Sequence, residues 1–282
     1  MIITFKVIMA SYNRRSLTLS VLSQLRKLET STIGINVTVC DDGSTDGTGD
    51  AIRLAFPEVQ VIETPGELFW AKSMNIADVA TAEGNYDFLV WLNDDTSLMV
   101  DVFERVLLEY EKLQVANCIL VGALRDPITK MRTYSGCTHD EVDGKIHLDF
   151  ISPKGFPVAL GMFSGNFVVI SKEVRRLVGP ISSKFRHGWA DMEYGYRAKH
   201  KGVKTYLMSD YVGYSEINPL YSFHLNPKNS RWSRIRHVLS KKSYHPIDYL
   251  RFCLIAFRFR GVRIYFSNMW RMVTHAFNGS AG

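Results

Sequence analysis

The sequence predicts an α/β fold in which a mostly parallel sheet is flanked by helices. Two observations carry this prediction. Short apolar segments of strand length recur through residues 2–95 and alternate with segments whose apolar residues have helical spacing. The connections between the expected strands are about a dozen residues long, which suits right-handed crossovers between parallel strands.

The expected elements alternate along the chain. Strands are expected at 2–9, 35–40, 59–62 and 87–95. Helices are expected at 16–28, in a short stretch that ends at 56, and at 71–80. Further on, the pattern predicts helices at 101–113 and 191–201. It predicts strands at 118–124, 163–170 and 203–208, of which the strand at 163–170 is expected to be buried. Polar, glycine-containing turns between 131 and 151 interrupt the alternation and predict a small antiparallel excursion.

Composition narrows the class of protein. With 282 residues and an apolar content of 46%, the chain is long enough for one large α/β domain and an appendage. Its four cysteines lack Cys-x-x-Cys spacing, so no zinc site or disulfide framework is indicated and a reducing, cytoplasmic setting fits best. No signal peptide is visible, and no apolar run approaches the roughly 18 residues of a spanning helix.

The net charge of +6 is concentrated near the carboxyl end. Residues 226–277 hold eleven of the 34 Lys and Arg residues, one of the 28 Asp and Glu residues, and ten aromatic residues. We therefore divide the chain into a main domain at 1–225 and a basic, aromatic-rich helical extension at 226–282. This composition favours helices that lie on an anionic membrane surface. The alternative is an extension packed on the main domain with a solvated basic face.

Acidic residues follow the apolar strand expected at 87–92 directly. Asp94 and Asp95 stand at its carboxyl end, where open α/β sheets place their ligands. Adjacent carboxylates repel each other unless a cation lies between them, and hard cations take oxygen ligands. The pair therefore indicates a site for a metal ion and a diphosphate. The alternative is local, since Asp and Asn also form turns and cap helices, here the helix expected near Asp101.

Two further strand ends carry polar residues on the same edge of the sheet. The first strand ends in residues 10–14 (ASYNR), which offer backbone groups and an aromatic ring, and the second ends in residues 41–46 (DDGSTD). A carboxylate in the second stretch can accept hydrogen bonds from a nucleotide base or ribose. Each stretch alone is ordinary turn chemistry. Together with Asp94 and Asp95, they predict one shared site.

A third acidic stretch opens the helix expected at 191–201. One interpretation is a capped helix in which Glu193 and Arg197 form an i,i+4 ion pair, and it suits Glu193. Asp191 follows His187 and Trp189 closely, and could instead act as a general base at the wall of a site. The chain contains no GxGxxG after the first strand, no GxxxxGK[ST] and no GxSxG, which disfavours dehydrogenases, nucleoside triphosphatases and hydrolases.

Four motifs together resemble, in order and spacing, those of the family 2 glycosyltransferases, which are inverting nucleotide-sugar enzymes of the GT-A fold. The motifs are VIMASYNR at 7–14, VCDDGSTDGT at 39–48, WLNDDT at 91–96 and WADMEYGYRAKHKG at 189–202. The resemblance covers roughly residues 2–215. A further stretch, LFWAKSMN at 68–75, resembles sequences from the branch of this family that builds bacterial surface polysaccharides.

The resemblance implies roles for individual residues. Nucleotide contacts would come from Ala10, Ser11, Tyr12, Arg14, Asp42, Trp70, Lys72 and Asp94. Mn²⁺ or Mg²⁺ would bind Asp95, with Asp94 in its shell and His224 as a further ligand, although a lone histidine is more often structural. Asp191 would deprotonate the acceptor hydroxyl, and the acceptor would contact Trp189, His187 and Glu193.

The sequence departs from the family pattern in two places. Ala190 stands where the family often has a second acid, so the role of Asp191 rests on spacing. Residues 65–67 (PGE) replace the usual Asn-x-Gly, which weakens the assignments of Trp70 and Lys72.

The resulting expectation is a metal-dependent inverting glycosyltransferase that moves a hexosyl or rhamnosyl group from a UDP- or dTDP-sugar. Its acceptor would be a growing bacterial glycan of an O-antigen, capsule or exopolysaccharide, carried on a polyprenyl lipid at the inner face of the cytoplasmic membrane. No nucleic-acid partner is expected. One alternative is a nucleotidyltransferase that makes nucleotide sugars, although residues 10–15 lack the glycine-rich loop expected for it. The other is a non-catalytic module that binds membranes or nucleic acid.

Overall fold

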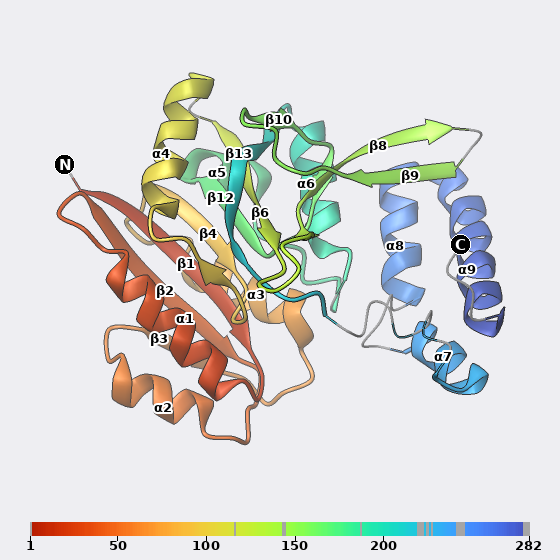
Figure 1. Ribbon diagram of the computed structural model, residues 1–282, viewed down its shortest axis with the longest axis horizontal. Helices are drawn as coiled ribbons and strands as arrows, with labels where there is room; N and C mark the ends of the chain where they lie inside the picture. The colour runs from red at the N-terminus through yellow and green to blue at the C-terminus, as the bar shows by residue number, and fades with distance from the viewer. Residues whose placement is uncertain are drawn as a thin grey trace.

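The computed structural model describes residues 2–115, 117–142, 145–186, 188–218, 223, 226, 228–240 and 246–278. It confirms the predicted α/β fold, in which a mostly parallel sheet is flanked by helices and a small antiparallel sheet lies at one side (Figure 1).

The large sheet begins with four parallel strands, in the spatial order β3 (Gln60–Glu63), β2 (Ile33–Asp41), β1 (Ile3–Ser11) and β4 (Phe88–Leu92). It continues with β12 (Phe167–Ser171), β6 (Cys118–Arg125), β13 (Lys204–Tyr214) and β10 (Val158–Ala159). Strand β12 runs antiparallel to both of its neighbours, and β6 and β13 are parallel to each other. The short strands β5 (Ser97–Leu98) and β7 (Arg132–Tyr134) pair with β13 and β6.

The strand order reverses between β1 and β4. After β1 the chain builds β2 and β3 on one side, and it then returns to form β4 on the other side of β1. Such a reversal opens a crevice at the carboxyl ends of the two strands, and ligands of open α/β sheets bind there. The register places Ser11 beside Asp41 and Ile8 beside Trp91, so the three strands end at a common edge.

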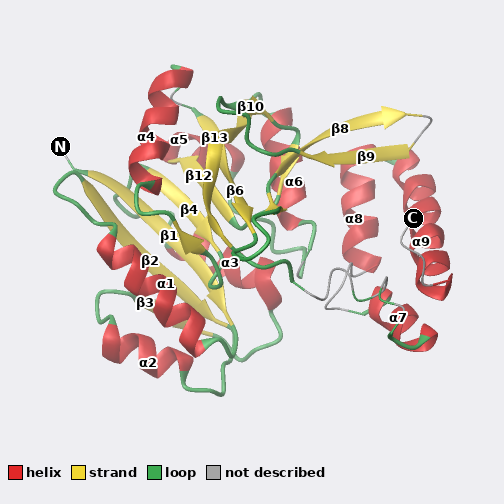
Figure 2. Cartoon of the chain, in the orientation of Figure 1, coloured by secondary structure: helices red, strands yellow, loops and turns green. Residues whose placement is uncertain are grey.

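Helices cover both faces of the sheet. One face carries α1 (Arg15–Lys27), α2 (Thr48–Ala55) and α4 (Val102–Leu113), and the other carries α3 (Phe69–Ala80), α5 (Lys172–Val178) and α6 (Ala190–His200) (Figure 2). Successive residues of a strand point to opposite faces. In β4, Val90 and Leu92 accordingly pack toward α1 and α4, while Leu89 and Trp91 join the core beneath α3 and α6.

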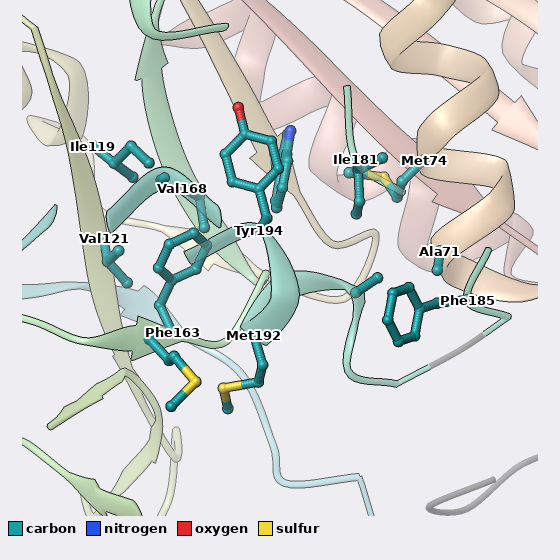
Figure 3. Close-up of a cluster of buried hydrophobic side chains, with 14 of the residues drawn as sticks. Ala71, Met74, Ile119, Val121, Phe163, Val168, Ile181, Phe185, Met192 and Tyr194 are labelled. Atoms are coloured by element: carbon teal, nitrogen blue, oxygen red, sulfur yellow. The ribbon is translucent and has the colours of Figure 1, made fainter. Parts of the chain in front are cut away.

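The core beneath α3 and α6 supports the carboxyl edge of the sheet. Tyr194 of α6 packs edge-on against Trp91, with 4.8 Å between ring centroids. Phe163 and Met192 belong to the same buried cluster, part of which Figure 3 shows. Asp78 of α3 forms an ion pair with Arg175 of α5 inside this layer and also accepts the backbone N–H of Ile181 at 3.0 Å. These contacts fix α3, α5 and α6 relative to one another.

The predicted antiparallel excursion is confirmed. It consists of β8 (Gly136–Val142), β9 (Lys145–Phe150) and β11 (Met162–Phe163), which form a separate three-stranded sheet. The β8–β9 ribbon extends away from the large sheet (Figure 1).

Three helices follow the sheet on the side away from α1 and α2, namely α7 (Arg231–Val238), α8 (Pro246–Phe257) and α9 (Phe259–Asn278) (Figure 1). Their apolar residues Val238, Phe252 and Ile264 belong to the same hydrophobic cluster as the α3 and α6 core. The α8–α9 contact is close, since a Cβ on Gly261 would lie 2.1 Å from the carbonyl oxygen of Cys253. No helix within the described ranges is long and apolar enough to cross a membrane.

Candidate active site

Two carboxylates and one guanidinium meet where the strand order reverses. Arg14 follows β1 and precedes α1, and its Nη1 lies 2.9 Å from Asp94 Oδ1 and 2.8 Å from Asp95 Oδ2. The two acids follow β4, so the ion pairs join the loops of two neighbouring parallel strands. The predicted convergence of residues 10–14 with Asp94 and Asp95 is therefore present.

The environment of the two acids differs. Asp94 is 4% exposed, whereas the side chain of Asp95 is 32% exposed. Burial raises the pKa of Asp94 to about 6; Arg14 opposes this rise, and the charge of Asp95 adds to it. One positive charge thus offsets two neighbouring carboxylates only in part.

One oxygen of each carboxylate takes no part in the ion pairs with Arg14. Asp94 Oδ2 and Asp95 Oδ1 are buried and have no hydrogen-bond partner among the described residues. Buried carboxylate oxygens without a partner are costly. Within the same residues, no group of three or more His, Cys, Asp or Glu side chains surrounds a common point. Mg²⁺ is typically held by one or two carboxylates together with substrate phosphates, so the donor set fits such an ion.

The loops after β1 and β2 are tied together. Asn13, with φ of 51°, donates its backbone N–H to Ser44 Oγ at 2.9 Å and accepts the N–H of Thr45 at 2.7 Å. Tyr12 projects from this region with 56% of its surface exposed, while Ser11 is buried and bonded to Thr18. The edge therefore carries one exposed aromatic ring on a rigid loop.

The carboxylate of Asp42 accepts hydrogen bonds from neighbouring residues of the chain. It is 6% exposed and accepts the backbone N–H groups of Leu68 and Phe69 at 2.8–3.1 Å and the hydroxyl of Thr64 at 3.0 Å. It therefore caps the start of α3 and fixes the loop between β3 and α3. Its predicted contact with a nucleotide base stays a prediction and must share these oxygens.

The departure at residues 65–67 has a structural basis. Gly66 has φ of 99° and lies directly against Gly43, where an added Cβ would come within 2.9 Å of the Gly66 Cα. Only glycine tolerates both the backbone conformation and the close approach.

Trp70 contacts both the loop after β4 and Gly165. Its Nε1 donates to Asn93 Oδ1 at 2.9 Å, and its ring packs edge-on to Trp91 at 6.4 Å. A Cβ on Gly165 would lie 2.6 Å from Trp70 Cη2, so the indole fills the space above Gly165. Lys72 lies two residues further along α3 and is half-buried.

Asp191 lies beside the same glycine. Its Oδ2 accepts the N–H of Gly165 at 2.9 Å, and its Oδ1 accepts the N–H of Met192 at 2.9 Å, within the first turn of α6. Burial raises its pKa, and the two N–H groups oppose the rise. Asn166 accepts the backbone N–H of Asn93 at 3.1 Å, so a short path of hydrogen bonds joins Asp191 to the loop that holds Asp94.

Two residues predicted to bind the acceptor have other partners. Trp189 stacks on Tyr249 and Phe252 of α8, with ring centroids 4.5 Å and 5.0 Å away. Both carboxylate oxygens of Glu193 accept from Arg197, at 2.9 Å and 3.1 Å, and Arg197 also donates to the carbonyl groups of Val178 and Pro180. These contacts give Trp189 and Glu193 structural roles, and the Glu193–Arg197 pair is the one that the capped-helix interpretation expected. Their predicted contacts with the acceptor stay a prediction.

His187 and His224 lie outside the described residues, so their predicted contacts are not placed. Conversely, sequence reasoning gave no role to Asn93, Gly165 or Asn166. A glycine that interrupts an apolar strand pattern is a signal of close approach, and Gly165 carried that signal.

The structure is similar to several solved structures, one of them of a mannosyltransferase. Residues 1–349 of TarS from S. aureus match with a TM-score of 0.57 and 12% identity, covering 98% of this chain and 81% of that one. The mannosyltransferase PcManGT from Pyrobaculum calidifontis, in complex with GDP-Man and Mn²⁺, matches with a TM-score of 0.58 and 15% identity, covering 98% and 73%. TarS residues 1–349 in complex with UDP-GlcNAc give a TM-score of 0.56 and 13% identity, covering 97% and 79%. At this identity the likeness establishes the fold.

Sequence comparison identifies the family. No curated protein matches the chain. The fold is the GT-A type of α/β fold, a Rossmann-like sheet, and Asp94 and Asp95 follow β4 at the point where its strand order reverses. The profile described as glycosyl transferase family 2 matches residues 6–174, more than half of the chain, and the protein belongs to this family.

Proposed function

We propose that this glycosyltransferase transfers a hexosyl or rhamnosyl group from a UDP- or dTDP-sugar with inversion, and that it uses Mn²⁺ or Mg²⁺. The observation that carries the proposal is the pair Asp94 and Asp95, which has two unpartnered buried oxygens and lies at the reversal point, joined by hydrogen bonds to the surroundings of Asp191. Neighbouring structures with UDP-GlcNAc and with GDP-Man and Mn²⁺ support a nucleotide-sugar donor.

The donor side is formed by the loops after β1 and β4. Backbone groups of Ala10 and Ser11 and the exposed ring of Tyr12 would hold the base, and Arg14 would reach the diphosphate. Asp95, with Asp94 beside it, would hold the divalent cation. Once bound, that ion would neutralise the charge that grows on the leaving diphosphate.

The acceptor side is formed by the start of α6. Asp191 would take the proton of the attacking hydroxyl, an effect typically worth about 100- to 10,000-fold in rate. A single base opposite one leaving group suits a single displacement, which inverts the configuration. No covalent nucleophile is required in this scheme.

The acceptor would be a glycan on a polyprenyl lipid, met at the inner face of the cytoplasmic membrane. Support comes from the outer surface of α9. Its exposed large apolar residues recur at helical spacing, at Phe259, Val262, Phe266, Trp270 and Phe277. They form one stripe opposite the buried residues of the helix, since residues three, four and seven apart share a face.

Arginines border that stripe. Arg260, Arg263 and Arg271 are exposed on α9, and Arg258 is exposed at the turn before it. An apolar stripe beside a basic one suits a helix lying in the plane of an anionic bilayer surface. Each basic residue near such a surface contributes about 1 kcal/mol.

The donor and the metal are tested together by calorimetry. We expect UDP or dTDP to bind more tightly with Mn²⁺ than in EDTA, and Asp95→Ala to lose that difference because it removes a carboxylate ligand. GDP serves as the competing nucleotide. Glu193→Gln is the matched control, since it removes an acidic charge from a structural ion pair outside the donor side. If no nucleotide binds, or if Asp95→Ala keeps the full Mn²⁺ effect, the proposed donor site is wrong.

A further inference from the structure

Arg14 already occupies the position at which a cation is expected. A single nitrogen, Nη1, bridges Asp94 Oδ1 and Asp95 Oδ2 at 2.9 Å and 2.8 Å. The guanidinium comes from a residue 80 positions before Asp94, and it is the β1–β4 pairing that brings the two together. The folded chain thus supplies its own positive charge to the carboxylate pair.

The bridge uses only part of the guanidinium. The side chain of Arg14 is 41% exposed, and among the described residues its hydrogen bonds are made by Nη1. A guanidinium has five N–H donors in a planar fork that matches phosphate oxygens. The remaining donors of Arg14 are therefore available to a diphosphate while Nη1 stays on the acids.

The same geometry has an opposite consequence for a metal ion that arrives alone. A divalent cation on the free oxygens of Asp94 and Asp95 would lie within a few ångströms of the guanidinium, and like charges repel strongly in a partly buried site. A diphosphate changes the balance, because its negative charge attracts both cations. Arg14 should therefore oppose the metal without nucleotide and support the nucleotide without metal.

We propose that Arg14 is a resident cation of this site, which lets a nucleoside diphosphate bind without divalent metal and weakens the binding of the metal alone. The inference rests on the proposed function, because it takes a nucleoside diphosphate as the ligand. It adds that Mn²⁺ strengthens the binding of that ligand but is not a condition for it. Arg14 is in this sense a positioning residue for the carboxylates and a binding residue for the diphosphate.

Two titrations of the full-length protein test the proposal. Isothermal calorimetry measures UDP and dTDP binding in EDTA, and electron paramagnetic resonance measures free Mn²⁺ without nucleotide. For Arg14→Gln we expect UDP binding in EDTA to weaken about tenfold or more, since charge-assisted hydrogen bonds to phosphate are lost. For the same variant we expect Mn²⁺ alone to bind severalfold more tightly.

These two changes in affinity have opposite signs, whereas a simple loss of structure would weaken the binding of both UDP and Mn²⁺. Arg14→Lys keeps a positive charge and should recover part of the UDP affinity in EDTA. Arg15→Gln is the matched control, because Arg15 is exposed and engages Asp46 through its backbone N–H, and it should behave as wild type in both titrations.

The proposal is overturned if Arg14→Gln binds UDP in EDTA as tightly as wild type, or if it binds Mn²⁺ alone no better. A different result, on nucleotide binding by the wild-type protein, would contradict the proposed function instead. If wild type binds none of the nucleotides even with Mn²⁺, the donor class is wrong, whichever way the Mn²⁺ titration moves.

Discussion

Asp191, the proposed base, lies in the first turn of α6. The helix start places its carboxylate against the backbone N–H groups of Gly165 and Met192, and burial raises its pKa above the ordinary 3.8. A base must be ionised to accept a proton. If Asp191 is the base, the rate should fall as the pH is lowered through this raised pKa, and the ionised carboxylate should be fully active above it.

We expect Asp191→Asn to lower kcat about 100- to 10,000-fold while UDP binding stays within a factor of two or so, because an amide cannot take the acceptor proton. The pH dependence of kcat/KM for wild type should show an acid limb above pH 3.8. Retained turnover, or an equal loss of nucleotide affinity, would reject the role of Asp191 as the base.

Gly165 is a position at which an added side-chain methyl group would clash with neighbouring residues. An added methyl group would lie 2.6 Å from Trp70 Cη2 and 3.3 Å from Asp191 Cβ, so Gly165→Ala must displace the indole. We expect activity to fall about tenfold or more, with a loss of stability of about 1–3 kcal/mol, typical of overpacking. Gly34→Ala in β2, whose nearest contact would be 3.4 Å, is the control. Equal activities of the two variants would show that Trp70 is not held in place by Gly165.

At the scale of elements, the α3–α5 contact depends on one buried ion pair. The side chains of Asp78 and Arg175 are 1% and 10% exposed, and Asp78 also accepts the N–H of Ile181. Burial raises the pKa of Asp78, and Arg175 opposes the rise. The pair therefore orients α3 and α5 relative to each other.

Asp78→Ala should lower the free energy of unfolding by about 3–5 kcal/mol, because it leaves Arg175 buried without its counter-charge. Asp50→Ala on α2 removes an exposed partner of Arg53 and should change stability little. Urea denaturation measures both. Similar midpoints for the two variants would show that the α3–α5 pair adds no stability.

The α6–α8 contact is a second example at this scale. Trp189 stacks between α6 and α8, and the buried carboxylate of Asp248 in α8 accepts the N–H of Arg186 at 2.9 Å. The carbonyl of Arg186 in turn accepts the N–H of Ala71 in α3. Helix α8 therefore holds the segment that leads into Asp191, and the carboxyl-terminal helices are part of the body that supports the site.

For the whole molecule, the described part of residues 226–282 packs on the main domain with one side and keeps the other side exposed. Membrane binding by the exposed side stays a proposal. The inner sides of α8 and α9 pack into the main core, as the packed-extension alternative holds, while the outer side of α9 keeps its apolar stripe and arginines exposed. Removing the whole extension would also remove core residues such as Phe252, so substitutions on the outer side give the cleaner test of membrane binding.

We expect the wild-type protein to float with vesicles that contain phosphatidylglycerol, less so at high salt, and Phe266→Asp with Trp270→Asp to abolish flotation. These side chains are 64% and 74% exposed, so the fold should survive the change. Leu54→Asp on α2, where the leucine is 88% exposed, is the matched control. Flotation of the double variant at the level of wild type would refute the proposed membrane surface.

The sequence alone predicted the α/β class and the antiparallel excursion, which the structure confirms, and it named Asp94, Asp95 and Asp191 as candidate site residues. These follow from local patterns, since strand and helix periods and acids at strand ends are readable within ten residues or so. The GT-A fold came from the resemblance, because no local pattern specifies the full order of strands.

Only the tertiary structure decided which cation meets Asp94 and Asp95, which residue holds Trp70, and which helix Trp189 stacks against. Arg14 is 80 residues from Asp94, and Gly165 is 26 residues from Asp191. The pairing of β1 with β4 and of β4 with β12 brings these loops together, and a pattern of residues along the chain carries no information about such distances. Burial then sets the charge balance of the site, because it depends on every element that covers the edge of the sheet.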